Sequence, residues 1–375
     1  MEKPTLCMMF EAIGSYNSIG KVARNGVLAA LDAGWQVTVV ANRLDESLQD
    51  RVEWIKLYVP PRGFYLKWMT ARYFLIQAIG TRKFDVVHAH QPQHAAFSDI
   101  FQCHFLTRVA YERKCFTGGE GLRKKLGEAQ QIGVMSKEDS FYRGWNPNTR
   151  MLFCSQMMRD EFHRLYGPLP AEYVLNTMAP PVSLPTPEAR KKARKDLIGI
   201  EDDRPVLGYL GGIDERKGYR QLISGLEGDN DTFLLFGGPD TQTFDAPSLA
   251  GRFKGLGFVS DIATFFAACD IVAVPSFFDP CPAVIVEAAA HGVPTIATDG
   301  VGNLPTAVEY GAGESWDRNT SLVPVVRKIM SRHSEYSAAA VKMAEDFSVA
   351  KWQQFLLNLY DETLCAKRQQ RVSSR

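Results

Sequence analysis

The sequence predicts an α/β protein made of two doubly wound, Rossmann-like domains that face each other across a cleft. A chain of 375 residues is too long for one ordinary hydrophobic core and suits two domains. Strand and helix patterns alternate through both halves, as expected of parallel sheets covered by helices. Residues 179–187 contain four prolines in nine positions and favour a stiff, extended connection between the halves.

The first half begins with a short apolar run at residues 5–10, followed by a loop at 11–19. Residues 20–33 then place apolar side chains at helical spacing, and Gly34 ends that helix. Residues 36–41 are rich in β-branched side chains, which predicts a second strand. Further strands are expected at 52–58, 85–90, 151–154 and 173–175.

After the proline-rich segment the same pattern restarts. Strands are expected at 206–210, 232–236, 271–274 and 295–298, and helices at 217–226, 261–268 and 283–291. These boundaries give an N-terminal domain at 1–180 and a C-terminal domain at 181–346. A last helix, 347–365, should pack back toward the first domain, and residues 366–375 should be disordered. Ligands of such sheets bind beside the carboxyl ends of the strands, so a ligand is expected in the cleft.

Composition excludes several classes of protein. Lys and Arg number 43 against 42 Asp and Glu, so no global field favours a nucleic-acid partner, and the basic run 190–195 reads as a solvated helix face. Seven scattered cysteines without a CxxC spacing indicate neither a zinc site nor a disulfide framework. No apolar run is long enough to span a membrane, and residues 1–10 do not resemble a signal peptide. We therefore expect a soluble, cytoplasmic protein; the sequence does not indicate its oligomeric state.

The most informative stretch is residues 275–294, where Asp279 and Glu287 stand with seven residues between them. Asp279 should lie in a turn after a strand, and Glu287 about one turn into the next helix. Carboxylates accept paired hydrogen bonds, which suits vicinal hydroxyls of a sugar and of a ribose. The helix start, at Pro282, Ala283 and Val284, offers free N–H groups and a positive dipole end to a diphosphate. The alternative is a surface turn and helix with incidental acids.

This stretch resembles the signature of the family 4 glycosyltransferases. In that signature two acidic residues have seven residues between them, and the second is the Glu that begins Glu-Ala-x-Ala-x-Gly-x-Pro. The matching tail residues are Glu287, Ala288, Ala290, Gly292 and Pro294. Asp279 stands where the family usually has Glu, and Pro282 where it often has Gly. The resemblance implies the GT-B fold, a nucleotide-sugar donor bound mainly by the second half, and retention of the anomeric configuration.

Residues 211–218 resemble the family's Gly-Arg-x-x-x-x-Lys-Gly donor loop, with Gly211 as its first residue. Lys217 matches the lysine that grips the donor diphosphate; alternatively, it is an ordinary exposed lysine at a helix start. Gly212 stands in place of the partner arginine, and Arg216 could supply the missing cation. One charged contact is worth about 1.5–3 kcal/mol, so its loss should weaken donor binding without abolishing it.

Further matches lie in both halves. Residues 301–306 resemble the family's Gly-Gly-x-Pro-Glu motif, but Thr306 replaces the glutamate. Residues 84–90 resemble Asp-Val-(Val/Ile)-His-x-His, which implies that His90 reaches the donor sugar; a structural role fits His88 better. Gly20 best matches the family's glycine before its first helix. The absence of GxGxxG at this loop argues against a dehydrogenase.

Two segments bear on the acceptor. Residues 60–75 mix aromatic side chains with Arg62, Lys67 and Arg72, which could lie on an anionic membrane surface and present a lipid-linked acceptor. A buried amphipathic helix is the alternative. Residues 105–150 are charged and poorly patterned, and their layout, with Glu138, resembles the acceptor region of lipopolysaccharide-core glucosyltransferases.

We therefore expect a retaining, metal-independent hexosyltransferase of bacterial glycan or glycolipid synthesis, cytoplasmic or peripheral on the inner face of the cytoplasmic membrane. His90, Lys217 and Asp279 are the candidate catalytic residues. The nucleotide-sugar is a substrate, the acceptor is a carbohydrate or is lipid-linked, and no cofactor is expected. Two alternatives remain: a non-catalytic nucleotide-sugar binder, suggested by Gly212 and Thr306, and an epimerase of the same fold, which needs acid–base carboxylates that the sequence does not identify.

Overall fold

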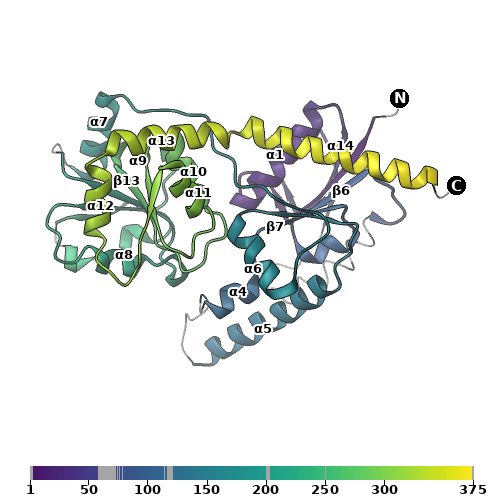
Figure 1. The fold of residues 1–375 in the computed structure, drawn as a ribbon, viewed down its shortest axis with the longest axis horizontal. Helices are drawn as coiled ribbons and strands as arrows, with labels where there is room; N and C mark the ends of the chain where they lie inside the picture. The colour runs from purple at the N-terminus through teal and green to yellow at the C-terminus, as the bar shows by residue number, and fades with distance from the viewer. Residues whose placement is uncertain are drawn as a thin grey trace. The chain divides into compact units, whose positions relative to one another are not determined.

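The computed structural model describes residues 3–57, 73, 75, 77, 79–113, 115, 121–199, 203–249 and 251–373. They form two compact α/β units, each with its own parallel sheet (Figure 1). The first unit comprises Met1–Arg108, Gly119–Asn176 and Val349–Arg375. The second unit comprises Val109–Gly118 and Thr177–Ser348. The predicted class, two doubly wound α/β domains, is confirmed.

The first unit contains a seven-stranded parallel sheet with strand order β5-β3-β1-β6-β7-β8-β9. Its strands are β1 (Thr5–Met9), β3 (Gln36–Ala41), β5 (Glu53–Lys56), β6 (Val86–Ala89), β7 (Ile100–Cys103), β8 (Arg150–Phe153) and β9 (Glu172–Val174). Two short strands, β2 (Ala12–Ile13) and β4 (Arg43–Leu44), pair separately. Because all seven strands run parallel, their amino ends meet at one edge of the sheet and their carboxyl ends at the other.

The helices of this unit are α1 (Ser18–Asp32), α2 (Glu46–Gln49), η1 (Pro92–Phe97), α4 (Thr107–Glu112), α5 (Gly121–Arg143), α6 (Gln156–Tyr166) and α14 (Val349–Ser373), with α4 continuing into the second unit. Asn17 starts α1 by accepting a hydrogen bond from the Gly20 amide at 2.7 Å. The segment 105–150, which showed no clear pattern in the sequence, contains α4 and the long helix α5.

Helix α14 packs along α1, where Gly26 allows a close approach: a Cβ there would lie 3.1 Å from the Leu356 side chain (Figure 1). The helix continues past residue 365, so residues 366–373, expected to be disordered, are helical. The physical reason is that Lys367, which lies beyond the predicted end of the helix, makes polar contacts with the rest of the first unit. The Lys367 ammonium donates to the Phe84 carbonyl at 3.3 Å and pairs with Asp99 at 3.0 Å.

The second unit contains a six-stranded parallel sheet with strand order β12-β11-β10-β13-β14-β15. Its strands are β10 (Val206–Leu210), β11 (Phe233–Gly237), β12 (Phe253–Gly255), β13 (Ile271–Val274), β14 (Thr295–Ala297) and β15 (Gly313–Ser315). Its helices are α7 (Pro187–Ile198), η2 (Glu215–Lys217), α8 (Tyr219–Gly225), η3 (Thr241–Thr243), η4 (Pro247–Leu249), α9 (Ile262–Ala268), α10 (Ala283–Ala290), α11 (Leu304–Tyr310), α12 (Val323–Met330) and α13 (His333–Asp346).

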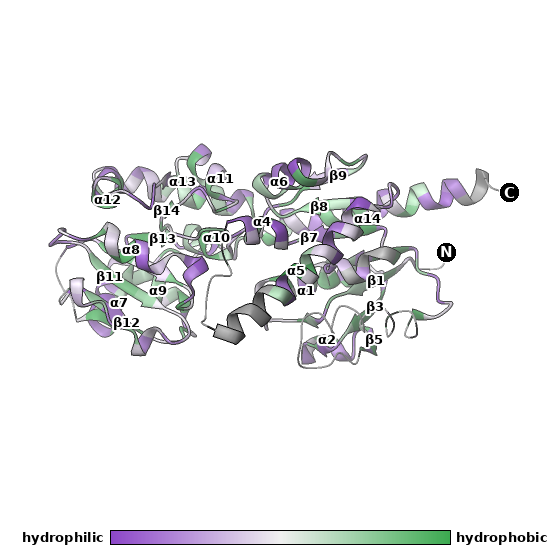
Figure 2. Cartoon of the chain, turned by 90° about the horizontal axis from the view of Figure 1, so that it is seen from below, coloured by the Kyte–Doolittle hydropathy of each residue, from purple (hydrophilic) through white to green (hydrophobic). Residues whose placement is uncertain are grey.

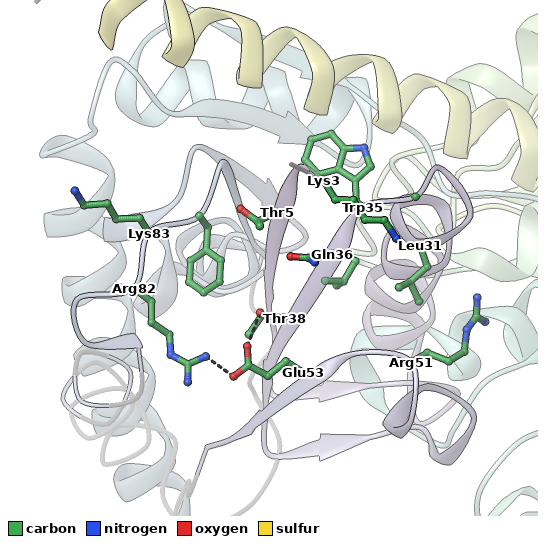
Figure 3. Close-up of a pocket in the computed structure, with 13 residues that line it drawn as sticks. Lys3, Thr5, Leu31, Trp35, Gln36, Thr38, Arg51, Glu53, Arg82 and Lys83 are labelled. Carbon is green, nitrogen blue, oxygen red and sulfur yellow. Dashed lines mark hydrogen bonds and ion pairs between the residues drawn. The ribbon is translucent and has the colours of Figure 1, made fainter. Parts of the chain in front are cut away.

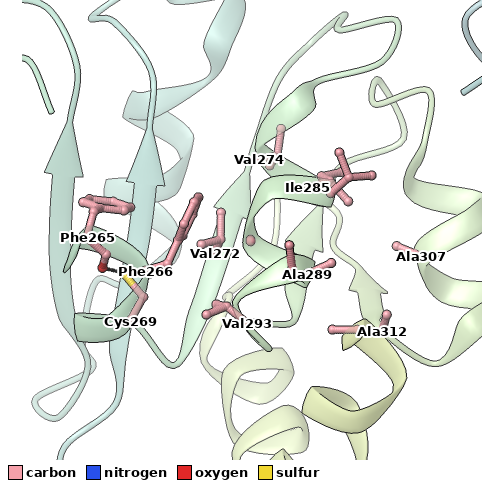
Figure 4. Packing of buried hydrophobic residues seen from close by; sticks show 14 of the residues in the cluster. Phe265, Phe266, Cys269, Val272, Val274, Ile285, Ala289, Val293, Ala307 and Ala312 are labelled. Carbon is pink, nitrogen blue, oxygen red and sulfur yellow. Dashed lines mark hydrogen bonds between the residues drawn. The ribbon is translucent and has the colours of Figure 1, made fainter. Parts of the chain in front are cut away.

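Alternate residues of the central strands of this unit enter two separate cores, one on each face of the sheet. In β13, Val272 and Val274 pack into the core with α9 and α10 (Figure 4). Ile271 and Ala273 pack into the other core. Such strands are buried on both sides and are therefore apolar at every position. Figure 2 shows the same property as hydrophobic colouring of the strands in this unit.

A buried ion network fixes α7 against the sheet. The Asp270 carboxylate accepts from the Val206 amide at 2.7 Å and pairs with both Arg190 and Arg194. Arg194 is buried, so the prediction that the run 190–195 is a solvated helix face is wrong for this residue. Among the residues described, no helix combines the length and the apolar character needed to cross a bilayer.

Candidate functional site

The sheet of the second unit changes direction of winding between β10 and β13. These strands are neighbours, yet β11 follows on the far side of β10 and β14 on the far side of β13. Loops 211–218 and 275–282 leave the carboxyl ends of these two strands. A switch point of this kind is the usual ligand site of an open α/β sheet.

Lys217 and Asp279 meet at this edge of the sheet. The Lys217 Nζ lies 2.5 Å from Asp279 Oδ2. Gly218 makes the approach possible, because it has φ +69° and a Cβ there would lie 2.0 Å from the Pro275 carbonyl oxygen. Backbone hydrogen bonds with Gly300 and Gly302 hold Asp279 on its other side, at 2.8 and 2.9 Å. Asp279 is buried, whereas the Lys217 side chain is 27% exposed and therefore within reach of a ligand.

Arg216 also faces the loop after β13. Its Nη1 donates to the Phe278 carbonyl at 2.9 Å, and its own carbonyl accepts from the Phe277 amide at 2.9 Å. Gly212 differs from its neighbours, because a Cβ built on it would meet no atom within 4 Å. Gly211 lies under the Tyr209 ring, whose hydroxyl donates to the Gly212 carbonyl at 2.8 Å. The loop thus has open space at Gly212, the position at which the donor-loop motif described above has an arginine.

Helix α10 begins directly after the Asp279 turn. Pro282 is its N-cap, Ala283 and Val284 are its first two residues, and no side chain caps this end. Asn303 Nδ2 donates to the Pro282 carbonyl at 3.1 Å and so ties the turn to the loop after β14. Glu287 is the fifth residue of α10 and partly buried. The structure therefore gathers two cations, one buried carboxylate and a helix N-terminus at one edge, an arrangement suited to an anionic ligand with hydroxyl groups.

Two neighbours of this site, Arg318 and Arg113, were not identified from the sequence. The Arg318 guanidinium lies 4.5 Å from the Phe277 ring centre and pairs with Asp299. The Arg113 guanidinium lies 5.7 Å from the Phe278 ring centre. Thr306, which was identified, is the third residue of α11 and partly buried.

His90 lies in the first unit, immediately after β6, and only 3% of it is exposed. Its Nδ1 is 2.9 Å from His104 Nε2, and its ring stacks on His88 with centroids 4.4 Å apart. His88 has a structural contact, from its Nδ1 to the Tyr360 hydroxyl at 2.8 Å. The contact between His90 and a donor sugar stays a prediction.

Four histidines gather around this position, three of them buried and His104 half-buried, and desolvation keeps all four rings neutral near pH 7. Burial lowers the pKa of His88 and of His104 to about 3 and that of His94 to about 4, and it holds the pKa of His90 well below its ordinary value. Within the described part of the chain, both ring nitrogens of His94 lack a hydrogen-bond partner. The described residues contain no group of three or more His, Cys, Asp or Glu placed to hold a metal ion.

Gly20 and Glu138 have local structural partners in the first unit. A Cβ on Gly20 would lie 2.4 Å from the Ala12 carbonyl oxygen, so a glycine lets α1 pack on the preceding loop. Glu138 accepts from the Thr107 amide at 2.9 Å and from its hydroxyl at 2.7 Å, capping α4. Burial raises the pKa of Glu138 to about 7. Of the segment 60–75, only Tyr73 and Leu75 are described, so Arg62, Lys67 and Arg72, for which a membrane contact was predicted, lie outside the described residues.

Family models match both halves of the chain. The model described as Glycosyltransferase Family 4 matches residues 19–176, and the one described as Glycosyl transferases group 1 matches residues 204–331. A D-inositol 3-phosphate glycosyltransferase of Mycobacteroides abscessus is 30% identical over 204 residues, which cover 48% of this chain and 44% of the relative. Soluble starch synthase 1 of Oryza sativa subsp. japonica is 27% identical over 51% of this chain and 28% of its own length. The chain thus aligns with less than half the length of either relative.

Solved structures share the fold over nearly the whole chain. WaaG, a glycosyltransferase involved in lipopolysaccharide biosynthesis, superposes with a TM-score of 0.76 at 15% identity, covering 95% of this chain and 99% of its own. Anabaena HepE in complex with UDP-glucose gives 0.68 at 16% identity, covering 96% and 99%. These neighbours show the two-domain GT-B fold.

Proposed function

Because the chain belongs to the family 4 glycosyltransferases, we propose that it transfers a hexose from a nucleotide-sugar donor to a carbohydrate or lipid-linked acceptor, with retention of configuration. The observation that carries the proposal is the Lys217–Asp279 pair at the carboxyl edge between β10 and β13. In this pair Lys217 supplies a cation that can bind the donor diphosphate, and Asp279 supplies a carboxylate that can accept hydrogen bonds from sugar hydroxyls.

In this proposal Lys217 exchanges partners when the donor binds. Without ligand its ammonium neutralises Asp279 at 2.5 Å. The donor diphosphate takes over the ammonium, with Arg216 as a second cation and the first amides of α10 as further donors. Asp279 is thereby released to accept from hydroxyls of the transferred sugar, and Glu287 accepts from the ribose.

Retention then proceeds by displacement on one face of the sugar. The leaving diphosphate oxygen takes the proton of the acceptor hydroxyl as the new glycosidic bond forms and the donor bond breaks. Lys217 and the α10 amides stabilise the negative charge that develops on the diphosphate. These groups supply positive charge at the site, so we propose that the reaction needs no metal. His90, in the first unit, is proposed to hold a hydroxyl of the donor sugar.

A catalytic role is separated from simple binding by a two-step experiment. Thermal-shift screening with UDP, GDP, ADP and their sugars identifies the donor, because a ligand at a hundred times its Kd stabilises by about 2.7 kcal/mol. The matching nucleotide-sugar is then incubated with the protein, and the release of nucleoside diphosphate is followed by chromatography. A transferase releases it slowly by hydrolysis even without acceptor. Tight binding with no release, with or without candidate acceptors, would favour the non-catalytic binder.

A further inference from the structure

The first unit holds a pocket of about 900 Å³ (Figure 3). It lies at the amino edge of the sheet, where Thr5 begins β1, Gln36 begins β3 and Glu53 begins β5. His90 follows β6 at the opposite, carboxyl edge of the same sheet. The pocket is therefore distinct from the edge at which this unit is expected to meet its sugar substrates.

Positive charge dominates the lining. Four cations, Lys3, Arg51, Arg82 and Lys83, face one carboxylate, Glu53. Arg82 pairs with Glu53, and Arg51 pairs with Asp32 at 3.4 Å. Within the described residues, the ammonium groups of Lys3 and Lys83 have no hydrogen-bond or ion-pair partner, and both side chains are exposed.

Neutral groups complete the pocket between these cations. In Figure 3, Arg82 and Lys83 lie on one side of a row formed by Thr5, Gln36 and Thr38, and Arg51 lies on the other. Trp35, Leu31 and Phe84 add apolar wall. The site thus offers separated positive charges and polar side chains around a partly apolar wall.

We propose that this pocket binds a phosphate-bearing small molecule at a site separate from the nucleotide-sugar donor. Its volume falls within the range of about 300–1,000 Å³ typical of small-molecule sites. Several cations around one concave surface raise the local concentration of a multivalent anion, and lysine and arginine are the usual phosphate ligands. The chain as a whole is nearly neutral, so this attraction is local to the pocket.

The test uses tripolyphosphate as the probe and calorimetry of the full chain. Lys217→Ala is the background for every variant, because removing this ammonium weakens anion binding at the donor site of the second unit. Lys3→Gln with Lys83→Gln removes the two unpaired cations of the pocket. Lys254→Gln with Lys342→Gln is the matched control, because both lysines are exposed, lie in the second unit and have no ion pair in the described residues.

The expected result is saturable binding in the Lys217→Ala background, weakened at least about tenfold in the pocket variant and by less than about twofold in the control. Absence of binding in that background, or an equal loss in both double variants, would overturn the proposal. A second arm uses vesicles with anionic phospholipid. If tripolyphosphate does not bind and vesicle binding is lost only in the pocket variant, the ligand is a lipid headgroup surface and the small-molecule assignment is wrong. The donor assay of the proposed function does not depend on either outcome.

Discussion

Acidification should unfold the first unit selectively, because its four clustered histidines, three of them buried and His104 half-buried, are held as neutral rings. Their pKa values in the folded state lie below the ordinary value of about 6.5, so the unfolded chain binds more protons once the pH falls through 6.5. The stability they contribute is present above pH 6.5 and is lost progressively as the pH falls toward their folded values near 3–4.

The size of this effect follows from proton linkage. Each such histidine costs up to about 1.4 kcal/mol of unfolding free energy per pH unit below 6.5. Glu138 acts in the opposite sense, since its pKa is raised to about 7 and the folded state gains its proton first. Glu138 therefore offsets one histidine, and the net loss between pH 6 and 5 is about 3–4 kcal/mol. Domains have only about 5–15 kcal/mol in total, so the loss is large.

Urea unfolding followed by tryptophan fluorescence at pH 7, 6 and 5 measures this loss. Five of the six tryptophans, all except Trp316, belong to the first unit, so the signal reports mainly on it. His104→Gln should reduce the pH dependence by about 1 kcal/mol per pH unit, since one titrating ring is removed. His333→Gln in the second unit is the control. A first-unit transition that does not move between pH 7 and 5, or a His104→Gln variant with the wild-type slope, would refute this reasoning.

Three further outcomes are expected. Gly212→Arg should tighten nucleoside diphosphate binding about tenfold or more, because the position is open and a further cation is added beside Lys217 and Arg216; unchanged or weaker binding by calorimetry would contradict the placement of the diphosphate at this loop. Transfer activity should persist in excess EDTA, since Lys217 and the α10 amides hold the diphosphate, whereas a collapse restored by Mg²⁺ or Mn²⁺ would contradict metal independence. Asp270→Ala should lower the unfolding free energy of the second unit by about 3–5 kcal/mol, because Arg194 stays buried without its carboxylate partner. Asp231→Ala, at an exposed position, is the control. Equal midpoints for the two variants in chemical unfolding would contradict the stabilising role of the ion network.

The sequence predicted the parts of this protein whose signals are local. Strands β10 and β13 were identified at their observed bounds because a strand buried on both faces is an uninterrupted apolar run. Lys217 and Asp279 were identified because each follows such a strand within a short motif, although 62 residues separate them.

Features without a local signal were not predicted. Arg318 reaches Phe277 from 41 positions along the chain, and its contact exists only because β14 and β15 complete the same sheet. His94 and His104 join His90 through the pairing of β6 with β7, and β7 was not identified as a strand. The buried role of Arg194 depends on Asp270, 76 residues away, so composition alone suggested a solvated face.

The central claim, that the second unit binds the donor with separate carboxylates for ribose and sugar, is tested most directly by calorimetry with the nucleoside diphosphate. Glu287→Ala should weaken its binding about ten- to a hundredfold, because a charged hydrogen bond to the ribose is lost. Asp279→Ala should leave the affinity near that of the wild type while turnover falls, because its contacts are made to the transferred sugar and its removal frees Lys217. If Asp279→Ala loses the diphosphate as severely as Glu287→Ala, the placement of the donor is wrong.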